Sequence, residues 1–90
     1  MNKSELIEHL ATRADLSKAS AGRALEAVIE GVMDALHRGD SVTIAGFGTF
    51  TVSRREPRVG RNPRTGAEVR IKGAKVPKFR PGKALKDHLN

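Results

Sequence analysis

The spacing of the apolar residues changes once along the chain, and this change restricts the fold to two kinds of structure in succession. Up to residue 36 apolar side chains recur every three or four positions, as in Leu6, Ile7 and Leu10, which is typical of one face of a helix. From residue 42 they alternate with polar residues, which is typical of strands. The sequence therefore predicts an α+β fold in which a helical hairpin precedes and packs on an antiparallel sheet.

Two helices are expected in the first half of the chain. Asn2 can cap the first helix, with Glu5 as its partner in a capping box. Ser17 is a good N-cap for a longer second helix, and Gly39 ends that helix as the residue after its C-cap. The connection is short, so the two helices should form an antiparallel or angled hairpin.

A β-hairpin is expected after the second helix. Val42 and Ile44 precede a turn at residues 46–48, and Phe50 and Val52 follow it in the alternation of a strand. A further strand near Phe79 gives a three-stranded sheet, which a short helix over residues 83–89 should follow.

Residues 52–78 are predicted to be two strands joined by a tight tip at residues 62–66. The ring of Pro63 fixes φ near about −65°, which suits the second position of a turn. Asn62 can hydrogen-bond across the turn, and Gly66 can take a left-handed conformation.

The middle of this stretch, from about 54 to 75, has no face to bury. It holds eight basic and two acidic residues but only three sizeable aliphatic ones. An isolated two-stranded ribbon is marginally stable in water, so we expect a flexible arm. The single domain, 1–90, would then consist of this arm and a body formed by residues 1–53 and 76–90.

The positive charge is confined to one half of the chain. Residues 1–45 carry five basic and seven acidic residues, whereas residues 46–90 carry twelve basic and three acidic ones. With only three aromatic residues, this composition favours a polyanion bound through charge over bases stacked on aromatic rings. The basic half lacks the apolar helical face of a membrane-surface protein, so no membrane partner is expected.

The small size of the chain favours an oligomer. A 90-residue chain has a thin core, and the absence of cysteine excludes disulfides and thiolate metal sites. The three histidines lie in unrelated places, so neither a metal nor another cofactor is expected. A helical hairpin on a three-stranded sheet leaves one side open, which a two-fold dimer would close. The expected dimer core is Val32, Leu36, Val42, Ile44, Phe47, Phe50 and Phe79.

No targeting or membrane-spanning segment is expected. The N-terminal stretch MNKSELIEHL has Glu5 and Glu8 where a signal peptide needs apolar residues. No apolar run approaches the roughly 18 residues of a membrane span. A cytoplasmic protein is therefore expected.

Four stretches of the sequence resemble a known family. These are MNKSELIEHLA at the start, GFGTF at 46–50, GRNPRTG at 60–66 and KVPKFRPGKALKDHLN at 75–90. They closely resemble the bacterial histone-like proteins of the HU/integration host factor family, and the resemblance covers the whole chain. It implies an intertwined dimer of the bacterial nucleoid, built from identical chains or with a paralogue. Its two arms would wrap DNA in the minor groove, with Pro63 wedged between base pairs.

Matching positions imply the DNA contacts. On the arm these are Arg55, Arg58, Arg61, Asn62, Pro63 and Gly66; on the body they are Lys3, Lys75, Arg80, Lys83 and Lys86. Five further cations make the arm and its base more basic than in several family members: Arg54, Arg64, Arg70, Lys72 and Lys78. Ala45 before GFG and the chain end at Asn90 favour the HU branch over integration host factor.

Double-stranded DNA bound largely without sequence preference is the expected partner. For roughly 6–10 phosphate contacts, affinity should fall by about 10³–10⁵ between 50 and 200 mM salt. Nicked, gapped or already bent DNA should bind more tightly, because its stacking is partly lost.

Several other interpretations compete with DNA bending. RNA is a possible but weaker partner, since its wide, shallow minor groove does not suit a wedge. A second alternative function is a scaffold that bridges DNA into filaments. For Pro63 the alternative role is that of a turn former only. Acidic residues on the second helix oppose a helix-turn-helix reader. No arrangement of serines, acids or a glycine-rich loop supports an enzyme.

Overall fold

The computed structural model describes residues 1–90, which form three helices and five strands. The chain divides into two compact units, Met1–Asp34 and Ala35–Asn90.

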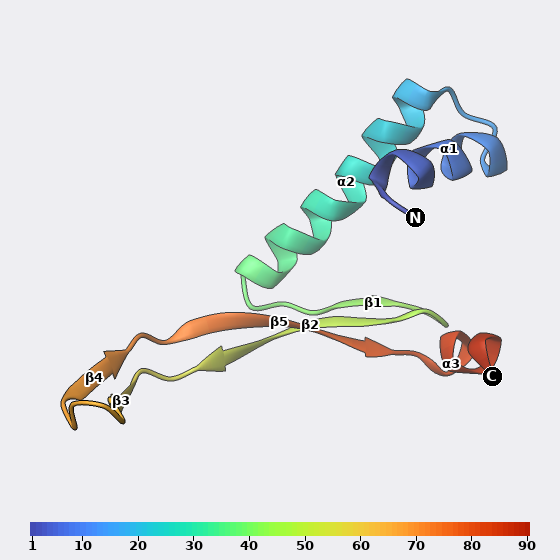
Figure 1. Ribbon diagram of the computed structural model, residues 1–90. Coiled ribbons are helices and arrows are strands. Elements are labelled where there is room, and N and C mark those ends of the chain that lie inside the picture. Colours follow the sequence, from blue (N-terminus) through green and yellow to red (C-terminus); the bar gives the residue numbers. More distant parts are fainter. The chain divides into compact units, whose positions relative to one another are not determined.

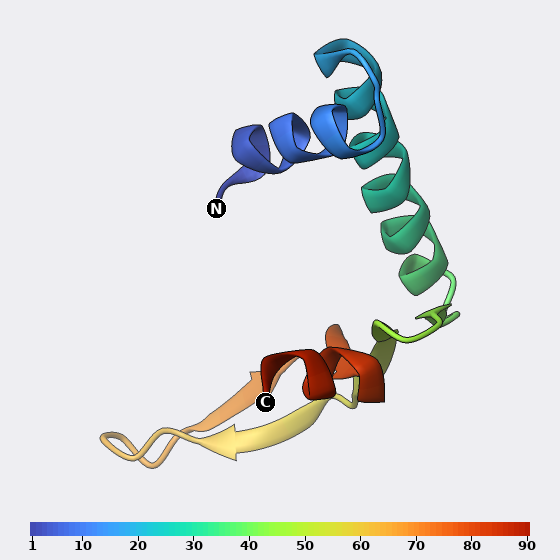
Figure 2. The same cartoon turned by 90° about the vertical axis from the view of Figure 1, so that its right-hand side faces the viewer.

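The first unit is a helical hairpin of α1 (Lys3–Arg13) and most of α2 (Lys18–His37), which pack together as Figures 1 and 2 show. Both predicted N-caps are confirmed. The side chain of Asn2 accepts a hydrogen bond from the Glu5 N–H at 2.9 Å, and Ser17 Oγ accepts one from the Ser20 N–H at 3.1 Å. These bonds satisfy helix donors that have no partner within the helix.

The end of α2 matches the prediction made at Gly39. The Gly39 N–H donates to the Leu36 carbonyl at 3.0 Å, and the Asp40 N–H donates to the Ala35 carbonyl at 2.9 Å. With a φ of 85° at Gly39, this is a Schellman motif. It fixes the backbone of residues 38–40 where the chain leaves the helix.

The second unit contains a three-stranded antiparallel sheet in the order β1-β2-β5. Its strands are β1 (Val42–Ile44), β2 (Gly48–Arg55) and β5 (Ala74–Pro81). The predicted turn between β1 and β2 is present, and α3 (Lys83–Leu89) follows β5 (Figure 1). The Leu85 N–H donates to the Gly46 carbonyl at 3.2 Å, which ties α3 to that turn.

The two faces of this sheet differ in chemistry. Val42 pairs with Phe50, and Phe50 pairs with Phe79, so these three side chains share one face. The alternate positions pair Thr49 with Arg80 and Thr51 with Lys78 on the other face. Over this part of the sheet one face is therefore apolar, and the other carries hydroxyls and cations.

The core of the single chain is very small. Ala21 and Ala35 are the only buried hydrophobic residues. Phe47 keeps 44 % of its surface exposed, and Phe79 and Ile44 each keep 41 %. The other residues of the predicted dimer core are half-buried: Val32, Leu36, Val42 and Phe50. The dimer itself stays a prediction, because a single chain is described.

The predicted ribbon is present, but its strands are not continuous from 52 to 78 as expected. The β2–β5 pairing ends where Arg55 meets Ala74, and a separate two-stranded sheet follows, formed by β3 (Arg58–Arg61) and β4 (Glu68–Ile71). Pro57 has no N–H to donate to a ladder. A Cβ on Gly73 would lie 2.7 Å from the Arg55 carbonyl oxygen and 2.9 Å from Pro57 Cδ. These two residues interrupt the ribbon.

Candidate nucleic-acid interface

The tip of the ribbon is a loop held by its own hydrogen bonds. Asn62 Oδ1 accepts from the Arg64 N–H at 2.9 Å, and the Asn62 carbonyl accepts from the Gly66 N–H at 2.8 Å. The Asn62 N–H donates to the Ala67 carbonyl at 2.9 Å, and Gly66 has a φ of 72°. The predicted roles of Asn62 and Gly66 in the turn are confirmed, and Pro63 is presented exposed in the loop.

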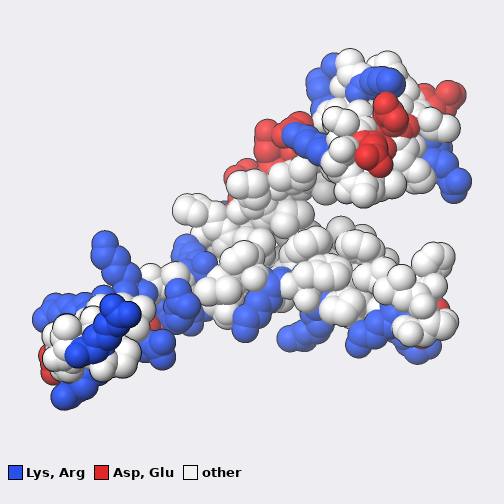
Figure 3. Space-filling model, viewed as in Figure 1, with Lys and Arg blue, Asp and Glu red and all other residues white.

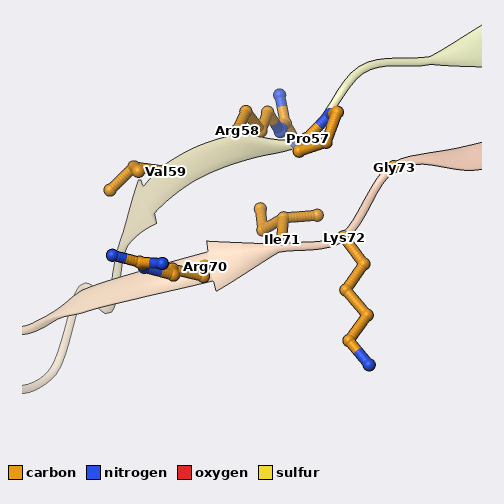
Figure 4. Close-up of a pocket in the computed structure, with 7 residues that line it drawn as sticks. All are labelled: Pro57, Arg58, Val59, Arg70, Ile71, Lys72 and Gly73. Carbon is orange, nitrogen blue, oxygen red and sulfur yellow. The ribbon is translucent and has the colours of Figure 1, made fainter.

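The distal ribbon β3–β4 places exposed cations around a small apolar hollow. The register pairs Arg58 with Ile71 and Val59 with Arg70. A hollow of about 370 Å³ lies along this ribbon, and Val59, Ile71, Arg58, Arg70 and Lys72 are among its lining residues. In Figure 4 Ile71 points toward Pro57, whereas Lys72 points away from the ribbon. Aliphatic surface with a cationic rim can contact the sugars and phosphates of a nucleic acid at once.

The cations near the base of the ribbon lie on two different faces. Arg55, Lys78 and Arg80 alternate with the apolar positions of β2 and β5 and lie on the hydroxyl-bearing face. Arg54 and Lys75 are direct cross-strand partners on the opposite face. Figure 3 shows Lys and Arg side chains over β3–β4 and along β2 and β5. The predicted contacts are therefore spread around the ribbon base rather than over one surface.

Several predicted contacts outside the distal ribbon already have partners. Lys75 Nζ donates to the carbonyl of His37, the last residue of α2, at 2.8 Å. Lys83 Nζ lies 3.2 Å from Asp87 Oδ2 within α3. Lys3, the only predicted contact in the first unit, pairs with Glu26. A phosphate that binds Lys75, Lys83 or Lys3 must displace or share these partners. Lys86, the remaining predicted contact on α3, is exposed.

Arg38 belongs to a cationic hollow that the sequence did not reveal. It lines this hollow of about 380 Å³ together with Arg54 and Lys75. Arg38 lies just beyond α2, in the half of the chain with a negative net charge, and no motif marked it. Only the pairing of β2 with β5 beside the end of α2 brings these three residues together.

No group of three or more His, Cys, Asp and Glu side chains is placed to hold a metal ion. None of the three helices combines the length and the apolar character needed to cross a bilayer.

A basic β-ribbon with a preformed, proline-bearing tip defines a nucleic-acid-binding protein that works through surface contact with a phosphate backbone. Comparison with known families agrees with this class. The family model described as "Bacterial DNA-binding protein" matches residues 1–90. The chain belongs to this family of bacterial DNA-binding proteins, and the histone-like resemblance found in the sequence is confirmed.

Curated relatives match over their full length. The chain is 60 % identical to DNA-binding protein HU-beta of Salmonella typhimurium over 90 residues, covering all of both chains. It is 59 % identical to DNA-binding protein HU-beta of Escherichia coli strain K12, again over all of both chains.

Solved structures of similar proteins confirm the fold class. The Anabaena HU–DNA cocrystal structure has a TM-score of 0.85 and 38 % identity, over 99 % of this chain and 97 % of that one. HU from Thermotoga maritima has a TM-score of 0.73 and 34 % identity, over 100 % of both chains. The protein is thus a histone-like DNA-binding protein of the bacterial nucleoid type.

Proposed function

We propose that this protein acts as a dimer that binds double-stranded DNA largely without sequence specificity, wraps the minor groove with two ribbons and bends the duplex. The observation that carries the proposal is the tip, where internal hydrogen bonds hold a loop with an exposed Pro63 between Arg61 and Arg64. The function served is stabilisation and compaction of DNA in the cytoplasm, at the nucleoid. No reaction is assigned to it.

Charge on the ribbon supports minor-groove binding. The cations of β3 and β4 are all arginine: Arg58, Arg61 and Arg70. Arginine is more weakly hydrated than lysine and favours the negative potential of a narrow minor groove. The groove's pattern of base edges is degenerate, so little sequence preference follows.

Pro63 supplies the wedge in this proposal. Its ring is apolar and rigid and has no N–H to desolvate, so it can enter a base step. Unstacking costs a few kcal/mol, which the added contact between a bent duplex and the protein recovers. Nicked or gapped DNA has already lost part of this stacking and is expected to bind more tightly.

The exposed apolar face of the sheet supports the dimer. A side chain such as Phe79, 41 % exposed in one chain, gains from a second chain that covers it. A homodimer accounts for this face with one gene product, and a paralogue of similar surface could take the same place. Within each chain, we assign residues 54–75 to the DNA-binding arm and 1–53 and 76–90 to the body.

The test is a comparison of one sequence as intact DNA, as nicked DNA and as RNA duplex, each of about 35 base pairs. Affinity and end-to-end distance by fluorescence energy transfer are measured across a salt series. Tighter binding to nicked DNA with a shortened end-to-end distance is the expected result. Equal affinity for DNA and RNA, with no shortening of the end-to-end distance, would show that the protein is a general binder of polyanions.

The variant Pro63→Ala tests the wedge. It keeps every arginine, so the salt dependence of binding should be retained while bending is lost. Thr65→Ser, a change at the same tip that keeps the proline and the hydroxyl that accepts from the Ala67 N–H at 3.2 Å, serves as the control. If Pro63→Ala bends DNA as strongly as the unaltered protein, Pro63 is a turn former only.

A further inference from the structure

The hollow that contains Arg38 lies between the turn after α2 and the strands β2 and β5. Six residues line it: Arg38, Gly39, Val52, Ser53, Arg54 and Lys75. Three of the six are cations, one offers a hydroxyl, and none is acidic. The lining is therefore complementary to an anion of modest size.

The fold fixes these cations from several sides. The Schellman motif sets the backbone at Arg38, and the strand register places Arg54 directly opposite Lys75. The hydrogen bond from Lys75 Nζ to the His37 carbonyl holds the ammonium at the end of α2. An ammonium carries three protons, so two remain for another acceptor.

Like charges in this arrangement are unfavourable unless an anion lies between them. Directly opposed cations on neighbouring strands destabilise a sheet. Each arginine has one carboxylate nearby, but at the long end of the range for an ion pair: Arg38 Nε lies 3.8 Å from Asp40 Oδ2, and Arg54 Nε lies 3.8 Å from Glu56 Oε1. All four of these side chains are more than 60 % exposed, so both pairs are weak.

We propose that this hollow binds one phosphate of the DNA backbone, with Arg38, Arg54 and Lys75 as its ligands. This inference rests on the proposed DNA-binding function and adds Arg38 to the interface. A phosphate has oxygen acceptors for both guanidinium groups and for the ammonium at the same time. Asp40 and Glu56 are released to solvent when it binds.

The first test is the salt dependence of DNA affinity for Arg38→Gln. The change removes an exposed side chain and leaves the backbone hydrogen bonds of the helix end in place. Affinity at low salt should fall about tenfold, and the slope of log affinity against log salt should fall by about 1 for each site. Arg38→Lys should restore most of the slope, because it restores the charge.

Arg13→Gln is the matched control, since it removes one exposed arginine from the end of α1 in the first unit. It should change the slope much less than Arg38→Gln does. Equal effects of the two variants would overturn the proposal, because the loss would then reflect net charge alone. Absence of DNA binding by the unaltered protein would instead overturn the proposed function.

The second test identifies the ligand. Duplexes with one nick, at which the protein is expected to bind in one position, are made with a single neutral methylphosphonate at successive backbone positions and are bound by the unaltered protein and by Arg38→Gln. At one backbone position the methylphosphonate should weaken binding of the unaltered protein but not of Arg38→Gln. Such coupling between a phosphate and a side chain is expected when the two are in direct contact. Additive losses at every position would overturn the assignment to DNA. A competition experiment by NMR gives a further check. If inorganic phosphate shifts the amide signals of Arg38 and Ser53 to saturation, and added DNA does not displace the phosphate and reverse these shifts, the assignment to DNA is also overturned.

Discussion

Phe50 and Phe79 are direct partners across β2 and β5, with ring centroids 4.9 Å apart and planes tilted by 45°. Phe47 lies against Phe79 in turn, at 5.4 Å. All three aromatic side chains of the protein, which the sequence placed in the expected dimer core, thus pack together in one cluster. Phe50 and Phe79 belong to the apolar face of the sheet, which one chain leaves partly exposed.

Phe79→Ala should destabilise the dimer. Truncating a phenylalanine that a partner buries costs about 3–5 kcal/mol, whereas truncating a half-exposed one costs less. The melting temperature of the unaltered protein should rise with protein concentration, and the variant should melt lower at every concentration. Val59→Ala on the ribbon, where Val59 is 62 % exposed, should change little. A melting temperature independent of concentration would contradict the dimer.

Gly73→Ala should disturb the junction between the two sheets. Its Cβ would meet the Arg55 carbonyl oxygen at 2.7 Å, so the backbone must shift. DNA affinity and bending should both fall, while circular dichroism of the helices stays unchanged. Gly60→Ala is the matched control, because the nearest atom to its Cβ is the end of the Ile71 side chain at 3.2 Å, which can move, and the nearest backbone atom is 3.9 Å away. Equal losses in both variants would refute the special role of Gly73.

Asn62→Ala should loosen the tip. It removes the acceptor of the Arg64 N–H and so weakens the preorganisation of the loop around Pro63. Bending, measured by energy transfer, should fall more than the salt slope does. Asn62→Asp keeps an acceptor but adds a negative charge, so it should retain the loop and weaken DNA binding at low salt. Unchanged bending in Asn62→Ala would show that the loop does not need this bond.

Lys75→Met should lower stability in the absence of DNA. The change removes the hydrogen bond to the His37 carbonyl and a cation at the C-terminal end of a helix, a loss of about 1 kcal/mol that outweighs the relief of the repulsion between Lys75 and Arg54. Urea unfolding measures it directly. Lys78→Met removes the same charge from the other face of β5 and should leave stability nearly unchanged. Similar losses in both variants would contradict the structural role of Lys75.

Local sequence signals predicted those parts of the fold that depend on neighbouring residues. Asn2 and Ser17 cap their helices with bonds that span three residues, and Gly39 ends α2 in the same local way. The tip at residues 62–66 is equally local, because its bonds join residues within the loop or directly beside it. The family resemblance then supplied the class of partner.

Features that depend on strand register were harder to predict. The break in the ribbon depends on Gly73 lying beside Pro57, and these two residues are far apart in the sequence. The division of the cations between two faces needs the pairing of Arg54 with Lys75. Arg38 joins them only because α2 ends beside these strands. None of these contacts follows from composition or spacing.

The interruption at Pro57 and Gly73 has a consequence for engineering. No ladder of hydrogen bonds runs from β3–β4 into β2–β5, because the pairing stops at Arg55 and Ala74 and starts again at Arg58 and Ile71. The residues beyond this gap form a cassette whose ends are fixed by the sheet. Such a cassette can be transplanted, lengthened or replaced by a different recognition loop while the three-stranded sheet keeps its own register.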